Sequence, residues 1–193
     1  MAEVPSTFQL AAGSPAPDFA LPDASGALLS PTNLVADRLG LLVVFACNHC
    51  PYVVHLADEL GRFADTIAAK GLATVAISAN DVERYPADAP DRMIHFAKAR
   101  GWRFPYLQDA TQEVAKSYAA ACTPDFYLFD SDLKLVYAGQ FDDSRPGRGV
   151  ATGADLAAAV ENLIEGKATP PPWFPSTGCS IKWIPGNEPD YFG

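Results

Sequence analysis

The chain has 193 residues, of which 49% are hydrophobic and 19% are charged, and its formal net charge is −9. This length and composition are typical of one globular domain with its own hydrophobic core, and they exclude a disordered chain. The acidic excess, with 14 Lys and Arg residues scattered along the chain, argues against nucleic acid or an anionic membrane surface as a partner.

The N-terminal segment contains Glu3 and Pro5 and has no basic region followed by an apolar run, so it does not resemble a secretory signal. No stretch of the chain reaches the ~18 consecutive apolar residues needed to span a bilayer. We therefore expect a cytoplasmic protein without a membrane segment. In a reducing compartment, the four cysteines are expected to be catalytic, redox-sensing or metal-binding rather than structural.

The first half of the chain predicts a hairpin, a buried strand and a long helix. Two short extended segments, 19–21 and 27–29, flank a turn and predict an N-terminal hairpin. The apolar run 41–46 predicts a strand that is buried on both faces. The helix is expected to end at Gly71, and its apolar face is marked by residues three and four apart: Val53, Leu56, Leu60, Phe63 and Ile67.

The second half predicts further strands and helices. Residues 72–78 form the second central strand, and Asp88 is the expected N-cap of a helix with Pro90 in its first turn. Asp109 and Gln112 resemble the capping box of the following helix. The remaining predicted elements are a short strand near 106–107, an antiparallel pair at 126–129 and 133–138, and a last helix ending at Gly166. This order predicts an α/β fold with a mixed central sheet and helices on both faces.

Two cysteines lie where the first central strand meets the long helix, in the sequence Cys47-Asn48-His49-Cys50. Thiols at this spacing can close a small disulfide ring, and the dipole and free N–H groups of the helix N-terminus favour a thiolate. The arrangement is typical of thiol–disulfide exchange. We expect Cys47 to be the nucleophile, with the lower pKa and the greater exposure, and Cys50 to resolve the mixed disulfide. His49 is expected to stabilise the thiolate, and the alternative is an exposed residue at the helix start.

The order of elements, with a Cys-x-x-Cys motif after the first central strand, resembles the thioredoxin superfamily. Segment 15–21, Pro-Ala-Pro-Asp-Phe-Ala-Leu, resembles the opening of its redoxin branch. The resemblance implies a thioredoxin-like fold in which Thr123-Pro124 faces the cysteines with a cis peptide bond and docks the substrate strand. Within this branch, four stretches resemble peroxiredoxin-like members: the motif Cys-Asn-His-Cys-Pro-Tyr-Val with its flanks, 80–86, 142–146 and 178–183.

We expect a thioredoxin-like domain at residues 1–167 and an irregular tail at 168–193 that packs back on it without forming a helix or a strand. Cys179, in this tail, is a candidate resolving thiol. Cys122 is a candidate auxiliary thiol near the active site, or a small buried hydrophobe. The tail carries several large apolar residues whose joint exposure would create a sticky patch: Trp173, Phe174, Ile181, Trp183 and Ile184.

The predicted function is a thiol–disulfide oxidoreductase that acts through the Cys47–Cys50 pair. Its expected partners are protein or low-molecular-weight disulfides and thiols, with a reductant that the sequence does not identify. No organic cofactor is expected, because the chain has no glycine-rich phosphate loop or dinucleotide motif. Asp142, Asp143 and Arg145 predict a solvated turn, with a substrate groove as the alternative.

Two other functions stay open at this point. A thiol peroxidase would use Cys47 or Cys50, but peroxiredoxins carry Thr or Ser three residues before their reactive cysteine. Here Val44 precedes Cys47 at that distance, and Cys47 itself precedes Cys50. A zinc or copper protein would use the cysteines and His49, but the chain has no second Cys-x-x-Cys motif.

Overall fold

The computed structural model describes residues 3–192, and its main feature is a five-stranded β-sheet. The strands of this sheet are β4 (Gly40–Phe45), β5 (Leu72–Ser78), β6 (Tyr106–Gln108), β8 (Asp125–Asp130) and β9 (Leu135–Gly139). Their order is β6-β5-β4-β8-β9, with β4, β5 and β6 parallel and with β8 and β9 added antiparallel. The predicted mixed sheet is confirmed, and each predicted strand of it begins and ends within two residues of the observed one.

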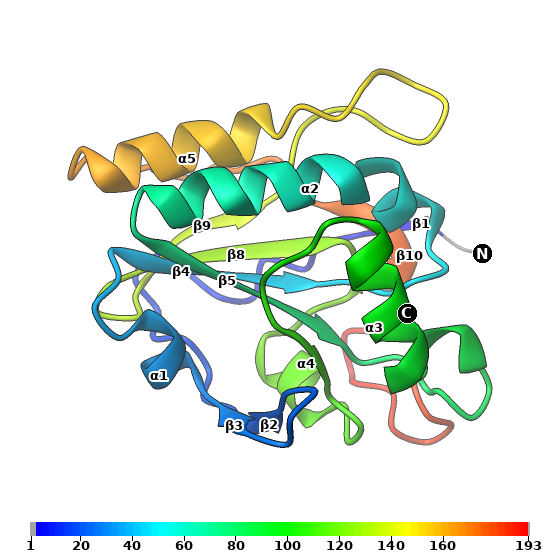
Figure 1. Cartoon of the computed structure of the whole chain (residues 1–193). Helices are drawn as coiled ribbons and strands as arrows, with labels where there is room; N and C mark the ends of the chain where they lie inside the picture. The colour runs from blue at the N-terminus through cyan, green and yellow to red at the C-terminus, as the bar shows by residue number, and fades with distance from the viewer. Residues whose placement is uncertain (1–2, 193) are drawn as a thin grey trace.

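Helices cover both faces of this sheet, as predicted (Figure 1). They are α1 (Pro31–Val35), α2 (Pro51–Ala69), α3 (Pro90–Ala99), α4 (Glu113–Ser117) and α5 (Ala154–Ile164), with one 3-10 turn, η1 (Pro86–Asp88). Helices α2 and α5 lie on one face, and α1 and α4 lie on the other. None of the described helices is long and apolar enough to cross a membrane.

Strand β4 is shared by two hydrophobic cores, one on each face of the sheet. Leu42 and Val44 pack into the core beneath α2 and α5, whereas Val43 and Phe45 pack with Tyr118 on the opposite face. All of these side chains are fully buried, and each stabilises the fold by roughly 1.5–3 kcal/mol. The end of β4 is therefore a rigid support for the residues that follow it, beginning with Cys47.

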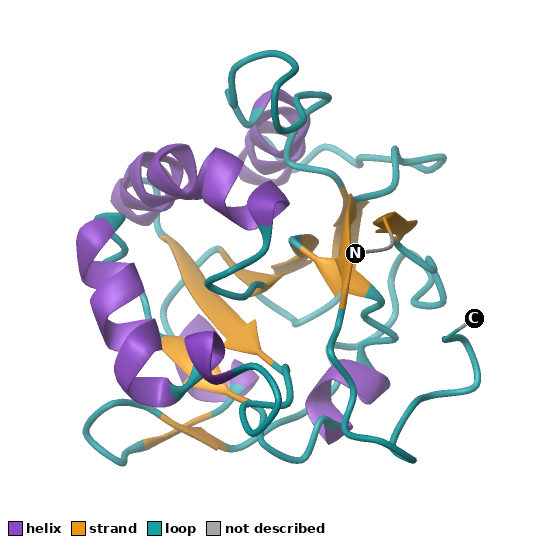
Figure 2. Cartoon of the chain, turned by 90° about the vertical axis from the view of Figure 1, so that its right-hand side faces the viewer, coloured by secondary structure: helices purple, strands orange, loops and turns teal. Residues whose placement is uncertain are grey.

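The predicted N-terminal hairpin is formed by β2 (Leu21–Pro22) and β3 (Leu28–Leu29), in which Leu21 pairs with Leu29. A second, three-stranded sheet joins distant parts of the chain in the order β1 (Glu3–Pro5), β10 (Thr177–Ser180) and β7 (Cys122–Thr123), with all pairs antiparallel. Figure 2 shows this small sheet beside the N-terminus, next to the larger sheet.

The C-terminal tail thus contains a strand, and the expectation that it has none was wrong. The sequence Thr-Gly-Cys-Ser has no strand periodicity, and it pairs because β1 and β7 offer it an edge on either side. Gly178 allows the close approach, because a Cβ atom there would lie 2.0 Å from the carbonyl oxygen of Thr123. Trp183 is buried in the core on the face covered by α1 and α4, whereas Phe174 is exposed.

Two predicted helix caps were also wrong. The N-cap of α3 is Ala89, not Asp88, and Asp88 is buried instead. Gln112 precedes α4 in a left-handed conformation (φ 65°), and its side-chain amide donates to the carbonyl oxygens of Ala79 (2.6 Å) and Lys182 (3.0 Å) rather than closing a capping box. Both side chains bind backbone groups that are distant along the chain, and local sequence spacing does not predict such contacts.

Candidate active site

The two cysteines of the motif meet the Thr123–Pro124 segment at the end of β4. The Thr123–Pro124 peptide bond is cis, as expected. The Sγ atom of Cys47 lies 3.4 Å from the hydroxyl oxygen of Thr123. The thiol of Cys50, the N-cap residue of α2, donates to the carbonyl oxygen of the same threonine at 3.0 Å. Thr123 therefore contacts both sulfur atoms through different groups.

The other two cysteines lie on neighbouring strands. Cys179 on β10 is paired in register with Thr123 on β7, the residue whose carbonyl oxygen accepts from the Cys50 thiol. Cys122 is fully buried, and its thiol lies 3.6 Å from the carbonyl oxygen of Pro124. All four cysteines are free thiols and all four are buried. Cys50 interacts with both Cys47 and Cys179, so these three thiols form one cluster.

Ionisation within this cluster favours Cys50. Hydrogen bonding from Cys47, with further contacts from Cys179 and the backbone N–H of Val53, lowers the pKa of Cys50 to about 5 against the opposing effect of burial. The interaction with Cys50, burial and the charge of Asp88 raise the pKa of Cys47 well above its ordinary value. The expectation that Cys47 has the lower pKa was therefore wrong. The expected difference in exposure is slight, because Cys47 is 1% exposed and Cys50 is 0% exposed.

His49 forms an ion pair with a carboxylate that the sequence did not assign to the site. The Nδ1 atom of His49 lies 2.7 Å from Oδ2 of Asp88, and its ring stacks on Tyr85 at a centroid distance of 5.6 Å. The contact with Asp88 raises the pKa of His49, although burial opposes this. His49 is half-buried rather than an exposed residue at the helix start.

Asp88 is held by its ion pair with His49 and by two hydrogen-bond donors. Besides His49, the backbone N–H of Asn48 donates to it at 2.7 Å and the side-chain amide of Asn80 donates at 2.8 Å. Burial opposes its ionisation, but these contacts hold the pKa of Asp88 below its ordinary value. Tyr106 supports the same loop by donating to the carbonyl oxygen of Ala46 at 3.3 Å. Sequence reasoning missed Asp88, Asn80 and Tyr106, because the contacts join segments that are distant along the chain.

A possible metal site can be tested against this geometry. Among the described residues, donor atoms of Cys47, His49 and Asp88 lie within 4.8 Å of one another. Two ligands of tetrahedral zinc, with bonds of about 2 Å each, are separated by about 3.3 Å. The 2.7 Å between His49 and Asp88 is too short for that arrangement and fits an imidazolium–carboxylate pair. The residues as placed do not fit a zinc centre.

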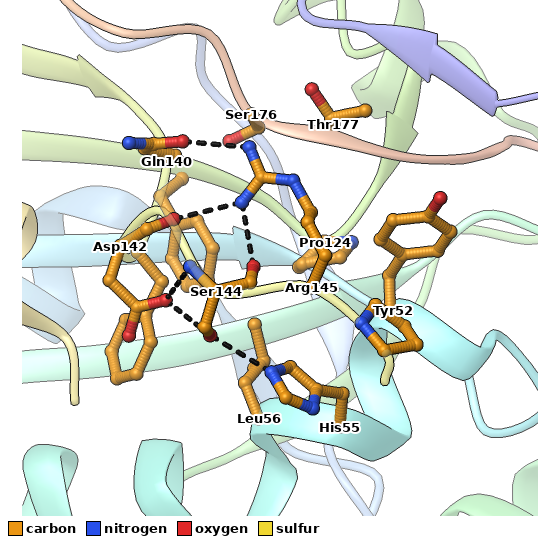
Figure 3. A pocket seen from close by; sticks show the side chains of 13 residues that line it. Tyr52, His55, Leu56, Pro124, Gln140, Asp142, Ser144, Arg145, Ser176 and Thr177 are labelled. Carbon is orange, nitrogen blue, oxygen red and sulfur yellow. Dashed lines mark hydrogen bonds between the residues drawn. The ribbon is translucent and has the colours of Figure 1, made fainter. Parts of the chain in front are cut away.

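A pocket adjoins the cis proline. Figure 3 shows Pro124 at its base, Tyr52 and His55 on the wall formed by α2, and Ser176 and Thr177 on the wall leading into β10. Leu56, Phe126 and Phe141 add an apolar lining.

Arg145 lies across this pocket and is fixed by three hydrogen bonds. Its Nη1 donates to the carbonyl oxygens of Asp142 (3.0 Å) and Ser144 (2.7 Å), and its Nη2 donates to Oε1 of Gln140 at 2.8 Å (Figure 3). The Nε–H group and one Nη2–H group have no partner among residues 3–192. His55 contacts the Ser144 hydroxyl at 2.9 Å.

The loop that carries Arg145 is ordered by Asp142, which is buried rather than solvated as predicted. Its carboxylate accepts from the backbone N–H groups of Thr152 (2.6 Å) and Gly153 (2.7 Å) and from the hydroxyl of Ser144 (2.5 Å). Asp143 is exposed, as expected of a turn residue.

Comparison with known proteins agrees with this fold. Residues 12–138 match the AhpC/TSA family, so the chain belongs to this family of thioredoxin-fold redoxins. No curated protein is significantly similar to it.

Two solved structures are similar over nearly the whole chain. An uncharacterised conserved protein from Geobacillus kaustophilus is 47% identical, with 96% of this chain and 98% of that one covered and a TM-score of 0.91. A hypothetical protein from Sinorhizobium meliloti 1021 is 48% identical, with 94% and 99% covered and a TM-score of 0.90. The thioredoxin domain of a thiol-disulfide oxidoreductase from Bacteroides vulgatus shares 20% identity over 81% of this chain and 99% of that one, with a TM-score of 0.63. This last likeness shows the thioredoxin-like fold, as predicted.

Proposed function

We propose that the protein is a thiol–disulfide oxidoreductase in which Cys47 and Cys50 form the redox pair. The observation that carries this proposal is the double contact of Thr123. Its hydroxyl can donate to a Cys47 thiolate, while its carbonyl oxygen accepts the S–H of a protonated Cys50. One residue thus stabilises the state in which the proton lies on Cys50 and Cys47 is the nucleophile.

Reaction begins with transfer of the Cys47 proton to Cys50, whose S–H donates to the carbonyl oxygen of Thr123 while Cys47 holds the negative charge. The Cys47 thiolate attacks one sulfur of a substrate disulfide, the substrate S–S bond breaks, and the other half leaves as a thiolate that takes a proton. Cys50 then loses its proton and attacks Sγ of Cys47. The second half of the substrate leaves as a thiol, and the protein keeps the Cys47–Cys50 disulfide.

We also propose a small disulfide bearing a carboxylate as the preferred substrate. The pocket beside Pro124 would receive the groups that flank the substrate sulfur, and Arg145 would offer its Nε–H and remaining Nη2–H as a fork for a carboxylate. Replacement by Arg145→Gln should raise KM for glutathione disulfide, which carries carboxylates, more than for cystamine, which carries amines. An equal change for both would exclude this role of Arg145.

The main test compares disulfide and peroxide reduction in the same protein. With dithiothreitol as reductant, the wild-type protein should reduce glutathione disulfide, and Cys47→Ala and Cys50→Ala should each abolish this activity. Cys122→Ala is the matched control and should retain it. Hydrogen peroxide reduction that is faster than disulfide reduction, and lost in Cys50→Ala, would instead identify a thiol peroxidase.

A further inference from the structure

Strand β10 places a third thiol at the redox pair. Cys179 lies opposite Thr123 in the β10–β7 pairing, and β10 also packs against α2, whose N-cap is Cys50. The backbone N–H of Ile181 donates to the carbonyl oxygen of Ala121 at 3.1 Å, which extends the pairing by another residue. On the other side of the strand, Cys179 pairs with Glu3 of β1, so main-chain pairing on both sides sets its position.

We propose that Cys179 is a redox-active thiol that exchanges with the Cys47–Cys50 disulfide, so that Cys50 pairs with either of two partners. This inference rests on the proposed function. The thiolate of Cys179 attacks Sγ of Cys50, and the Cys47–Cys50 bond breaks while a Cys50–Cys179 bond forms. The electron pair leaves on Cys47, which takes up a proton. The protein's oxidation level is unchanged, so the step needs no further oxidant or reductant.

The charges around Cys179 change in favour of this step when the pair is oxidised. In the reduced protein, burial and the neighbouring Cys50 thiolate raise the pKa of Cys179 to about 12. A Cys47–Cys50 disulfide carries no charge, so the repulsion from Cys50 is absent in that state. The ammonium group of Lys182, on the same segment, lowers the pKa of Cys179 and stays in place. The Cys179 thiolate therefore forms more readily when Cys47 and Cys50 are joined in a disulfide, which is the state that Cys179 attacks.

Gly178 makes the approach possible. Its missing Cβ would lie 2.0 Å from the carbonyl oxygen of Thr123, which also accepts from Cys50. Any side chain at this position moves β10 away from β7 and takes Cys179 with it. Gly178 is therefore a positioning residue, and its substitution offers a test that moves Cys179 without removing any sulfur atom.

The experiment maps disulfides after oxidation of the reduced protein with diamide, acid quenching, alkylation, digestion and mass spectrometry. Cys47→Ala should form an internal Cys50–Cys179 disulfide as its main product. Wild type should form both this disulfide and Cys47–Cys50, with the former lost in Cys179→Ala and reduced in Gly178→Ala. Cys122→Ala should keep the wild-type pattern.

The inference is overturned if folded Cys47→Ala, judged by its circular dichroism, yields only alkylated cysteines or intermolecular disulfides. If that variant does not fold, the disulfide map of the wild type is used instead. The inference is overturned if the wild type yields no peptide pair linked by Cys50–Cys179. A different result would contradict the proposed function. In that case the wild-type protein forms internal disulfides but does not reduce glutathione disulfide.

Discussion

His49 and Asp88 are joined across the active site, with 2.7 Å between Nδ1 and Oδ2. The carboxylate keeps the imidazole protonated to higher pH, but the same negative charge opposes a thiolate on Cys47. The pair therefore places one positive and one negative charge near the thiols. Its net effect on the pKa of each thiol depends on which of the two charges is closer to that sulfur.

Replacing Asp88 by Asn should make Cys47 more reactive. The amide oxygen still accepts from the backbone N–H of Asn48, the acceptor for the Asn80 side chain is lost, and the negative charge that raises the pKa of Cys47 is removed. The rate of iodoacetamide labelling at Cys47, followed by mass spectrometry at neutral pH, should rise, and the pKa of His49, followed by NMR, should fall. The exposed Asp91→Asn is the control. A slower or unchanged rate at Cys47 would show that the charge of Asp88 does not act on it.

The shared thiolate should titrate far below the ordinary cysteine range. Ultraviolet absorbance of the reduced protein should rise with an apparent pKa near 5, because thiol and N–H donors stabilise the Cys50 anion. Cys47→Ala and Cys179→Ala each remove one S–H donor and should raise this pKa, with the larger shift in Cys47→Ala. A titration above the ordinary range in the wild type would contradict the assignment.

Asp125, directly after the cis proline, should make the fold less stable as the pH rises. Burial raises its pKa from 3.8 to about 6, although Ser6 and Tyr127 donate to it. The folded state then holds this proton more tightly than the unfolded state. The contribution is fully present below pH 3.8 and is lost as the pH rises through about 6.

Asp125→Asn should remove this loss, raising the free energy of unfolding at neutral pH by up to about 3 kcal/mol. The hydroxyl of Tyr127 can rotate to accept from the new amide. Urea denaturation at several pH values across this window measures the effect, with the exposed Asp132→Asn as control. A variant whose stability declines with pH as steeply as that of wild type would assign the decline to other groups.

Gln112 should prove to be the main anchor of the C-terminal segment. Its amide group donates to Lys182 and accepts from the backbone N–H of Ile184 at 2.9 Å, all in a buried position. Gln112→Ala leaves these groups unpaired and should cost at least about 2 kcal/mol of stability. Hydrogen exchange should increase in β10 more than in β4, whereas the surface control Gln9→Ala should change neither. Equal exchange in both strands would show that the tail is held elsewhere.

The sequence was informative where structure follows from local pattern. A strand buried on both faces must be apolar throughout, so residues 41–46 and 72–78 identified β4 and β5. The cysteine spacing and Thr123–Pro124 predicted residues that the structure brings into contact. Asp88 and Gln112 were misread because an acid before proline and a polar residue before a helix look the same whether they cap locally or bind distant backbone. Strand β10 was missed because its conformation comes from its neighbours.

The pairing of β10 with β7 also bears on what the enzyme can accept. The strand edge at Thr123, where an extended polypeptide would bind through its main chain, is already taken by a segment of the same chain. A tethered segment acts at an effective concentration that is typically in the millimolar range, far above that of a cellular protein substrate. A polypeptide substrate would therefore have to compete with the protein's own β10 segment, whereas the small disulfide proposed above would meet no such competitor.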